Sequence, residues 1–427
     1  MKKINNILKH PLLKASLIYT ICDAINKAVP FFILPILSHY LLPSDYGLVA
    51  NFGVLAGILN LLVLLTMDGA ISVNYHRISK FELPVYIFNS FLISLGSFIF
   101  LFILFFIINK SINELLEIPF KYQILCLIMA LFNMISSINL IIWRLEERSL
   151  NFGIYGIGNT LVNIVFSLIL VVTLNKGWEG RIIGMAIAII LFGAYSWIYL
   201  FRNNYLKFEF NKFFFKDALV FGIPLLPHAL SFWLRSGIDR IYISNFWGSE
   251  QVGLYATGFQ FGLLVSFLIS AFNNAFSPYL FKTLSGTDEI QLNFNKRKIV
   301  RLTYYIIFGL SIAGLIFAFL SKYIIKFWFS KEYIQSIDFV TWAILAQVFN
   351  GFYILFVNYI FFVKKTKQLA SITIGCAFLQ VCLSYILVKY LGAIGAAYST
   401  VIVSLVNFII VMLFSMKIYP MPWFTKN

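Results

Sequence analysis

Apolar segments long enough to cross a lipid bilayer follow one another along almost the whole chain, with short polar connections between them. The bilayer interior offers the backbone no hydrogen-bond partners, so a spanning segment satisfies its own N–H and C=O groups as an α-helix of about 20 residues. We therefore expect an all-α integral membrane protein with about twelve transmembrane helices. The segments cover roughly residues 15–41, 46–74, 83–108, 120–143, 151–174, 181–201, 217–246, 251–281, 301–320, 335–363, 368–388 and 392–416.

The composition agrees with a membrane protein and excludes an ordinary soluble one. Hydrophobic residues make up 60% of the chain and charged residues 12%, whereas a soluble domain contains about 25% charged residues. The net charge of +16 therefore concerns membrane topology, and we expect no nucleic-acid partner. The cysteines stand singly and offer no metal-ligand spacing, so we expect no metal site and no cofactor.

Lysine and arginine are concentrated in alternate connections, with about 22 on the side of the N-terminus and about 8 on the other side. Because basic connections stay in the cytoplasm, both termini are predicted to be cytoplasmic. The connections 76–82, 202–216 and 282–300 are then cytoplasmic, and 109–119 and 321–334 are periplasmic. No connection is longer than about twenty residues, so no further domain is expected outside the membrane.

The sequence repeats itself after about 206 residues. Residues 43–53 and 248–259 each contain a small polar turn followed by Gly-Leu, between two apolar helices. A second repeat comprises Gly177, Gly180, Gly184 and Ala186 in one half and Gly392, Gly395, Ala396 and Ala397 in the other. Such small residues favour close helix packing. Duplicated helix bundles are typical of transporters, and we predict two six-helix lobes, residues 1–205 and 206–427.

Ionisable residues occur near the middle of two predicted helices. Asp23 and Lys27 are four residues apart in the first helix, and Arg235 and Asp239 repeat this spacing with reversed charges in the seventh. A charge at this depth costs at least about 2.5–3.5 kcal/mol, so it usually faces a cavity or a partner. Either Lys27 and Arg235 bind an anionic substrate while the aspartates hold them or relay a coupling ion, or each pair is a salt bridge that stabilises its helix.

Two further residues of the seventh helix are candidates. Arg240 lies nearer the outer end, where it either contributes to substrate binding or extends towards the headgroups. His228 directly follows Pro227, and Pro224 and Pro227 interrupt the helical hydrogen bonds. It is either a proton carrier or a buried, hydrogen-bonded imidazole.

Several stretches resemble the polysaccharide-transport branch of the multidrug/oligosaccharidyl-lipid/polysaccharide superfamily, and O-antigen flippases in particular. They are Leu-Leu-Pro-Ser-Asp-Tyr-Gly at 41–47, Phe-Gly-Ile-Pro-Leu-Leu-Pro at 221–227, Val-Gly-Leu-Tyr-Ala at 252–256 and the Asp239-Arg240 pair. The resemblance implies two lobes in a V, as in multidrug extruders, in the bacterial inner membrane. It also implies alternating access and transfer of undecaprenyl-diphosphate-linked repeat units to the periplasmic leaflet. Lys27 and Arg235 match the family's cavity cations.

The resemblance further implies an O-antigen polymerase and a chain-length regulator as partners, and coupling to a proton or sodium gradient. Two other functions stay open. A drug or cation exporter of the same superfamily would use carboxylates to attract its substrate, which the cations of this chain oppose. A polymerase-type membrane enzyme would need a long periplasmic loop, and the sequence contains none. We therefore expect a transporter that is not an enzyme.

Overall fold

The computed structural model describes residues 22, 25–26, 31–285 and 289–423. In this part of the chain the regular elements are all helical, as expected for a membrane-spanning chain of this type. Ten helical segments are long and apolar enough to cross a membrane. One of them, Lys212–Leu284, contains two spans, because Gly248 at φ 79° interrupts the helix. Together with the first predicted helix, of which residues 31–38 are described, this arrangement confirms about twelve spans.

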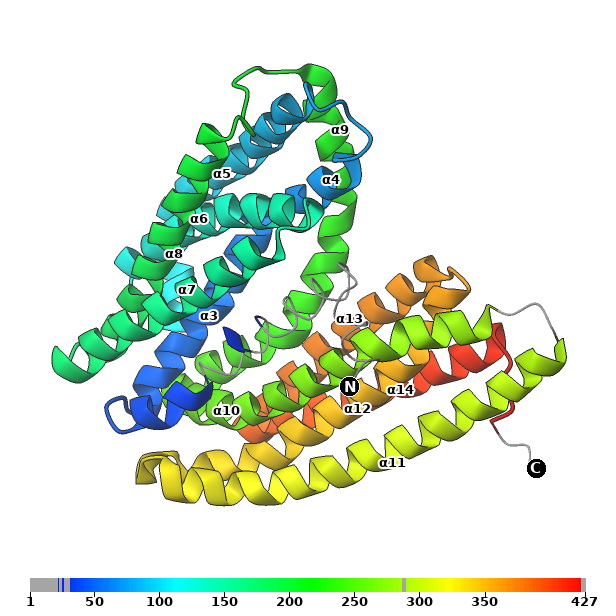
Figure 1. The fold of residues 1–427 in the computed structure, drawn as a ribbon. Coiled ribbons are helices and arrows are strands. Elements are labelled where there is room, and N and C mark those ends of the chain that lie inside the picture. The colour runs from blue at the N-terminus through cyan, green and yellow to red at the C-terminus, as the bar shows by residue number, and fades with distance from the viewer. Residues whose placement is uncertain (1–21, 23–24, 27–30, 286–288, 424–427) are drawn as a thin grey trace, which may run out of the picture. The chain divides into compact units, whose positions relative to one another are not determined.

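The first of two compact units comprises Met1–Trp233 and Gly248–Val252. Within it α8 packs on both α6 and α7, and α6 also contacts α3 and α5 (Figure 1). Its elements are α3 (Pro43–Leu64), α4 (Met67–Asn74), α5 (Leu83–Leu116), α6 (Phe120–Leu145), α7 (Ser149–Leu168), the π-helical turn η1 (Ile169–Thr173), α8 (Gly177–Arg202), α9 (Lys212–Gly222), the 3₁₀ turn η2 (Ile223–Leu225) and the first residues of α10 (Leu226–Leu284).

The second unit comprises Leu234–Trp247 and Gly253–Asn427. Here α14 packs against α12 and α13, and α11 against α12. Its remaining elements are α11 (Glu289–Trp328), the 3₁₀ turn η3 (Lys331–Ser336), α12 (Ile337–Phe362), α13 (Thr366–Leu391) and α14 (Ala393–Ile418). The predicted lobe boundary at residues 205/206 concerns the sequence repeat and stays a prediction. The compact first unit extends further because α9 packs on α4 and α5.

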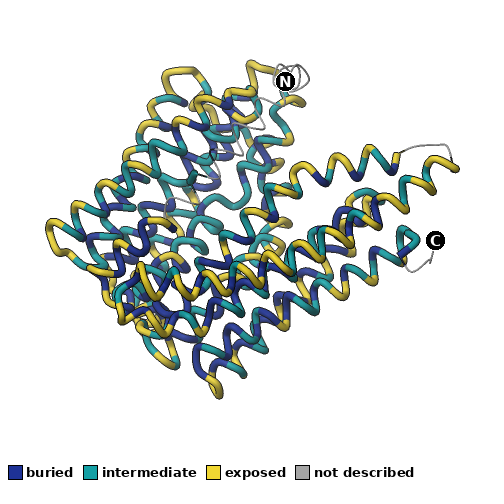
Figure 2. Tube along the Cα trace, turned by 60° about the horizontal axis from the view of Figure 1, so that its bottom comes forward, coloured by how far each residue is buried: buried dark blue, intermediate teal, exposed yellow. Residues whose placement is uncertain are grey.

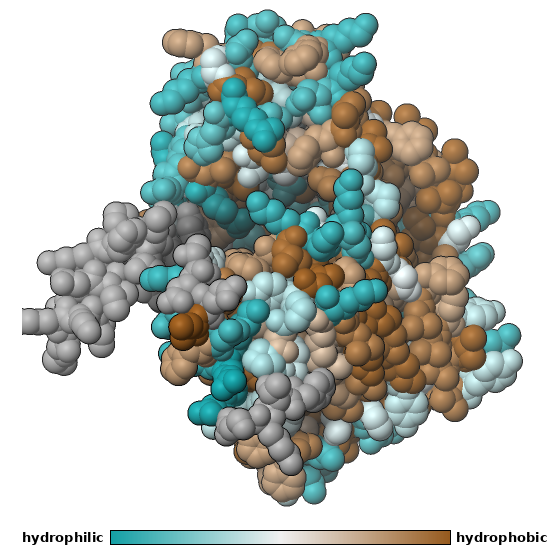
Figure 3. All heavy atoms as spheres, turned by 90° about the vertical axis from the view of Figure 1, so that its right-hand side faces the viewer, coloured by the Kyte–Doolittle hydropathy of each residue, from teal (hydrophilic) through white to brown (hydrophobic). Residues whose placement is uncertain are grey.

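The outer faces of the helices are apolar, which suits contact with lipid. Exposed and buried residues alternate along each helix in Figure 2, and many exposed ones are large hydrophobic side chains. Phe100 is 65% exposed, Ile107 75% and Leu315 72%. Figure 3 shows hydrophobic side chains spread broadly over one face. A soluble monomer rarely exposes so large an apolar surface, so these faces are read as lipid-facing.

Several predicted boundaries are wrong. The predicted connection 109–119 is helical to Leu116 in α5, 202–216 is helical from Lys212 in α9, and 321–334 is helical to Trp328 in α11. The second predicted helix, 46–74, is divided into α3 and α4, because Leu65 and Thr66 adopt left-handed backbone angles. Thr66 donates from Oγ1 to the carbonyl of Gly222, 3.0 Å away, which ties the break to α9. The predicted loop 282–300 is helical from Glu289 onwards, since α11 begins in this polar stretch, which the apolar pattern does not mark.

The predicted topology can be tested with single cysteines at two exposed serines. Ser79 belongs to a predicted cytoplasmic connection and Ser111 to a predicted periplasmic one, and both are exposed. We expect Ser111→Cys, but not Ser79→Cys, to react with an impermeant maleimide on intact cells, because basic residues crowd the connection that contains Ser79. Both should react after permeabilisation. Equal labelling of the two positions in intact cells would contradict the orientation.

Candidate functional site

Asp239 of α10 lies at the centre of a buried polar cluster in the second unit. Its side chain is only 3% exposed, yet it accepts four hydrogen bonds from neutral side chains. Ser384 and Gln380 donate to Oδ1 at 2.5 and 2.9 Å. Thr400 and Tyr255 donate to Oδ2 at 2.8 and 3.0 Å. The carboxylate is therefore fully surrounded by hydroxyl and amide groups.

Three helices bring these donors together. Gln380 and Ser384 are one turn apart on α13, so they present their side chains on the same face. Thr400 comes from α14. Tyr255 belongs to α10 itself, beyond the break at Gly248. Asp239 and one of its donors therefore lie on the two sides of the break in the same helix.

Small residues allow α13 and α14 to approach. Gly392 precedes α14 with φ 78°, a left-handed conformation that glycine adopts without strain. A methyl group at Gly395 would lie 2.1 Å from the carbonyl oxygen of Leu387 on α13. This approach brings Ser399 Oγ to within 2.7 Å of Ser384 Oγ. The structure thus supports the reading of the repeated glycines as packing residues.

Of the two alternatives for Arg235 and Asp239, the structure does not show the salt bridge. Among the described residues the ion pairs are Lys121–Glu179, Arg148–Glu146 and Lys207–Glu209. The spacing of four residues permits an ion pair, but the short Asp239 side chain accepts hydrogen bonds from residues of α13 and α14. The half-buried Arg235 lies near Tyr353 and Cys376. The two charges therefore do not neutralise each other.

Arg240 and His228 have separate surroundings. Arg240 is partly buried in the second unit, and its Nε is a buried donor without a hydrogen-bond acceptor in the described structure. His228 belongs to the first unit, is exposed, and packs edge-on against Phe232 at a ring distance of 5.1 Å. A buried imidazole is therefore not what the structure shows. Asp23 and Lys27 lie outside the described residues, so their roles stay predictions.

The first unit contains a related polar cluster that sequence reasoning missed. Asn163 and Ser167 are one turn apart on α7, as Gln380 and Ser384 are on α13. Arg181 of α8 donates from one nitrogen, Nη1, to Asn163 Oδ1 and Ser167 Oγ, each at 2.6 Å. The signal in the sequence is an amide and a hydroxyl residue four apart, followed by the repeated glycines.

The contact between the helices is also similar in the two clusters. A methyl group at Gly184 of α8 would lie 2.5 Å from Ser167 Oγ of α7. In the second unit the contact between α13 and α14 is made by Ser384 and Ser399. Each unit thus has a polar cluster at a contact between consecutive helices, α7 with α8 and α13 with α14. One surrounds an anion, and the other holds a cation.

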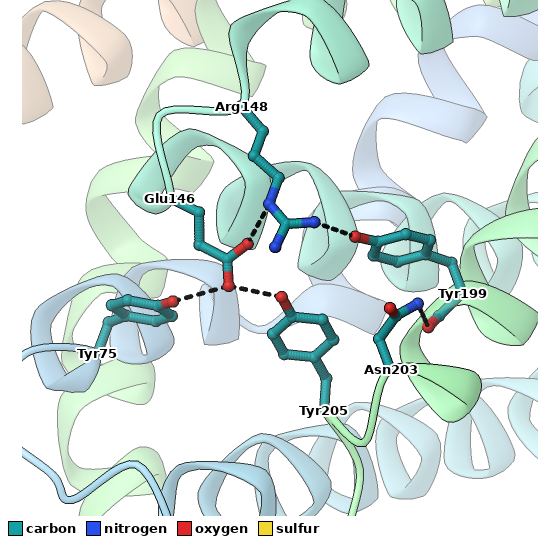
Figure 4. A network of polar contacts seen from close by, with 6 residues as sticks. All are labelled: Tyr75, Glu146, Arg148, Tyr199, Asn203 and Tyr205. Atoms are coloured by element: carbon teal, nitrogen blue, oxygen red, sulfur yellow. Dashed lines mark hydrogen bonds and ion pairs between the residues drawn. The ribbon is translucent and has the colours of Figure 1, made fainter.

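A third polar cluster joins the connections that are predicted to be cytoplasmic (Figure 4). Tyr75 and Tyr205 donate to Glu146 Oε1 at 3.0 and 2.5 Å, and Arg148 Nε lies 2.7 Å from Oε2. Arg148 also donates to the hydroxyl of Tyr199 at 2.7 Å. Burial, followed by the bond to Glu146, raises the pKa of Tyr75 to about 12, so this phenol remains a donor. The cluster fastens the connection after α8 to the first unit.

Known proteins resemble this chain over most of its length. The family model described as "Polysaccharide biosynthesis protein" matches residues 12–284. "Lsg locus putative protein 1" of Haemophilus influenzae is 24% identical over 92% of this chain and 97% of its own length. The capsular polysaccharide biosynthesis protein CapF of Staphylococcus aureus is 23% identical over 69% of this chain and 74% of its own length.

Solved structures share the fold. The lipid II flippase MurJ, in an inward closed conformation, has a TM-score of 0.73 and 18% identity, covering 94% of this chain and 87% of its own. An inward-facing multidrug resistance transporter of the MATE family, in the MOP superfamily, has a TM-score of 0.68 and 18% identity, covering 90% and 94%. These similarities establish the MATE-like architecture.

Proposed function

This chain belongs to the polysaccharide biosynthesis protein family, and we propose that it is a flippase for undecaprenyl-diphosphate-linked O-antigen or polysaccharide repeat units. It moves them from the cytoplasmic to the periplasmic leaflet of the bacterial inner membrane by alternating access. The family and the flippase-like fold support a multi-pass transporter of polysaccharide biosynthesis. The finer substrate assignment rests on the chemistry of α10.

The observation that carries the proposal is the half-buried Arg235 within a membrane-spanning helix. No carboxylate among the described residues forms an ion pair with it. A guanidinium donates two parallel hydrogen bonds to an oxyanion, which suits the diphosphate of a lipid carrier. Lys27 and Arg240 are the other proposed substrate-binding cations, and the buried Nε of Arg240 has an unused donor. The drug-exporter alternative offers no role for such cations.

Asp239 is proposed as the coupling residue. A buried carboxylate bound only by neutral donors can be neutralised by a proton or by a small monovalent cation. The surrounding oxygens of Ser384, Ser399 and Thr400 are hard ligands of the kind that sodium shares with other hard cations. Binding from the periplasm would favour one conformation of the second unit and release would favour the other. Asp23 and His228 remain further candidates for this relay.

Deletion of the gene is the direct test of the substrate. We expect cells without the protein to accumulate lipid-linked single repeat units in the inner leaflet, since flipping precedes polymerisation outside. Protection of these units from an impermeant glycosidase in intact spheroplasts measures the leaflet, and the intact gene supplied in trans is the control. Single units accumulating on the outer surface would instead indicate a polymerase, the partner that we expect to act next with a chain-length regulator.

A further inference from the structure

Arg181 is a second intramembrane cation whose partners are all neutral. It lies near the start of α8 and is partly exposed. The positive end of the helix dipole makes this an unfavourable place for a cation. The nearest acid in the sequence, Glu179, is bound to Lys121 at 3.0 Å. Among the described residues Arg181 therefore has no anionic partner.

The guanidinium of Arg181 is nevertheless held in a fixed orientation. Its Nη1 donates two hydrogen bonds, to Asn163 Oδ1 and to Ser167 Oγ, each at 2.6 Å. Ser167 is fully buried. The phenol of Tyr46, in the first turn of α3, lies near Arg181. With Nη1 fixed by two neutral acceptors, the edge formed by Nη2 and Nε remains for a planar or tetrahedral oxyanion.

We propose that Arg181 binds the diphosphate of the lipid-linked substrate at the end of the first unit that the charge bias assigns to the periplasm. This rests on the proposed function and adds a binding position in the first unit to the proposed substrate-binding cations Lys27, Arg235 and Arg240. Asn163 and Ser167 are positioning residues, because they orient the guanidinium through one nitrogen.

Photocrosslinking tests whether a lipid diphosphate binds beside Arg181. The probe is farnesyl diphosphate carrying a diazirine, added to the full-length protein in nanodiscs, and crosslinked peptides are identified by mass spectrometry. We expect crosslinks within residues 163–184, and Arg181→Gln should reduce them about tenfold, as expected for lost charge-assisted hydrogen bonds. Arg181→Lys should fall between, because it keeps the charge and loses the planar fork.

The matched control is Lys176→Gln, which removes an exposed cation next to the same helix start. It should change the yield by no more than about twofold, because exposed charges contribute little. Asn163→Asp separates binding from folding. It places a carboxylate beside Nη1, so it should preserve or raise the melting temperature while it reduces crosslinking as Arg181→Gln does. A purely structural Arg181 would leave the crosslinking of Asn163→Asp unchanged, which would overturn the proposal.

Three other outcomes are decisive. Equal crosslinking of residues 163–184 in the wild type and Arg181→Gln would overturn the proposal, while crosslinks elsewhere would leave the proposed function standing. Loss of the crosslink to excess phosphatidylglycerol, but not to unlabelled farnesyl diphosphate, would assign the site to ordinary phospholipid and overturn it. An absence of crosslinks anywhere, together with no inner-leaflet accumulation after gene deletion, would contradict the proposed function itself.

Discussion

Arg235→Ala is expected to lower transport of the lipid-linked repeat unit about tenfold to a hundredfold, with normal amounts of protein in the membrane. The guanidinium has no anionic partner among the described residues, so its removal takes a ligand from the substrate without leaving a buried carboxylate unpaired. Charge-assisted hydrogen bonds contribute about 1.5–3 kcal/mol, which corresponds to this range. Surface polysaccharide in complemented deletion cells, and flipping in proteoliposomes, measure the effect.

The chain offers controls for both charge and shape. Arg301→Ala removes an exposed arginine of the second unit and should leave transport unchanged. Arg235→Lys keeps the positive charge but loses the planar guanidinium, so it should retain part of the activity. Lys27→Ala should resemble Arg235→Ala, since the repeat places the two at related positions. Normal transport by both alanine variants would show that Lys27 and Arg235 do not bind substrate.

Asp239→Asn is expected to remove the dependence of transport on an ion gradient. The amide occupies the same volume, yet it cannot carry the charge that a proton or sodium ion would neutralise. Flipping into proteoliposomes, with the proton and the sodium gradient imposed separately, should then run at the same slow rate under both. In the wild type one of the two gradients should accelerate it, and that identifies the coupling ion.

Melting temperatures of Asp239 variants distinguish a role in ion coupling from a purely structural role. Asp239→Leu leaves up to four buried donors without an acceptor, at about 1–3 kcal/mol each, and should lower the melting temperature sharply. Asp239→Asn keeps an acceptor oxygen and should melt closer to the wild type. Asp338→Asn, at an exposed position of α12, is the matched control. Gradient-stimulated flipping by Asp239→Asn would rule out coupling through this residue.

Much of the fold could be predicted because the signals are local. A spanning helix satisfies its backbone within itself, so apolar length alone located α6, α8 and α14 to within a few residues. The apolar pattern gave wrong helix boundaries where the backbone conformation does not depend on apolar length. The break between α3 and α4 depends on a contact with Gly222, and the start of α11 extends into a polar stretch.

For the candidate site, too, one part could be predicted from the sequence and another part could not. The sequence by itself determined that α10 carries Arg235 and Asp239 inside the membrane, because two charges within an apolar run are visible without a structure. It could not determine their partners. Asp239 is bound by residues more than a hundred positions away, on α13 and α14.

Only the tertiary structure decided which faces of the helices meet. Spacing of four residues shows that two side chains share a face, but not what that face contacts. The repeated glycines let α8 approach α7 and α14 approach α13, and this approach brought Arg181 to Asn163 and Ser399 to Ser384. Backbone hydrogen bonds form within each helix, so the local sequence is sufficient to predict them. The pairing of polar side chains across helices depends on packing, so it emerges only when the bundle is assembled.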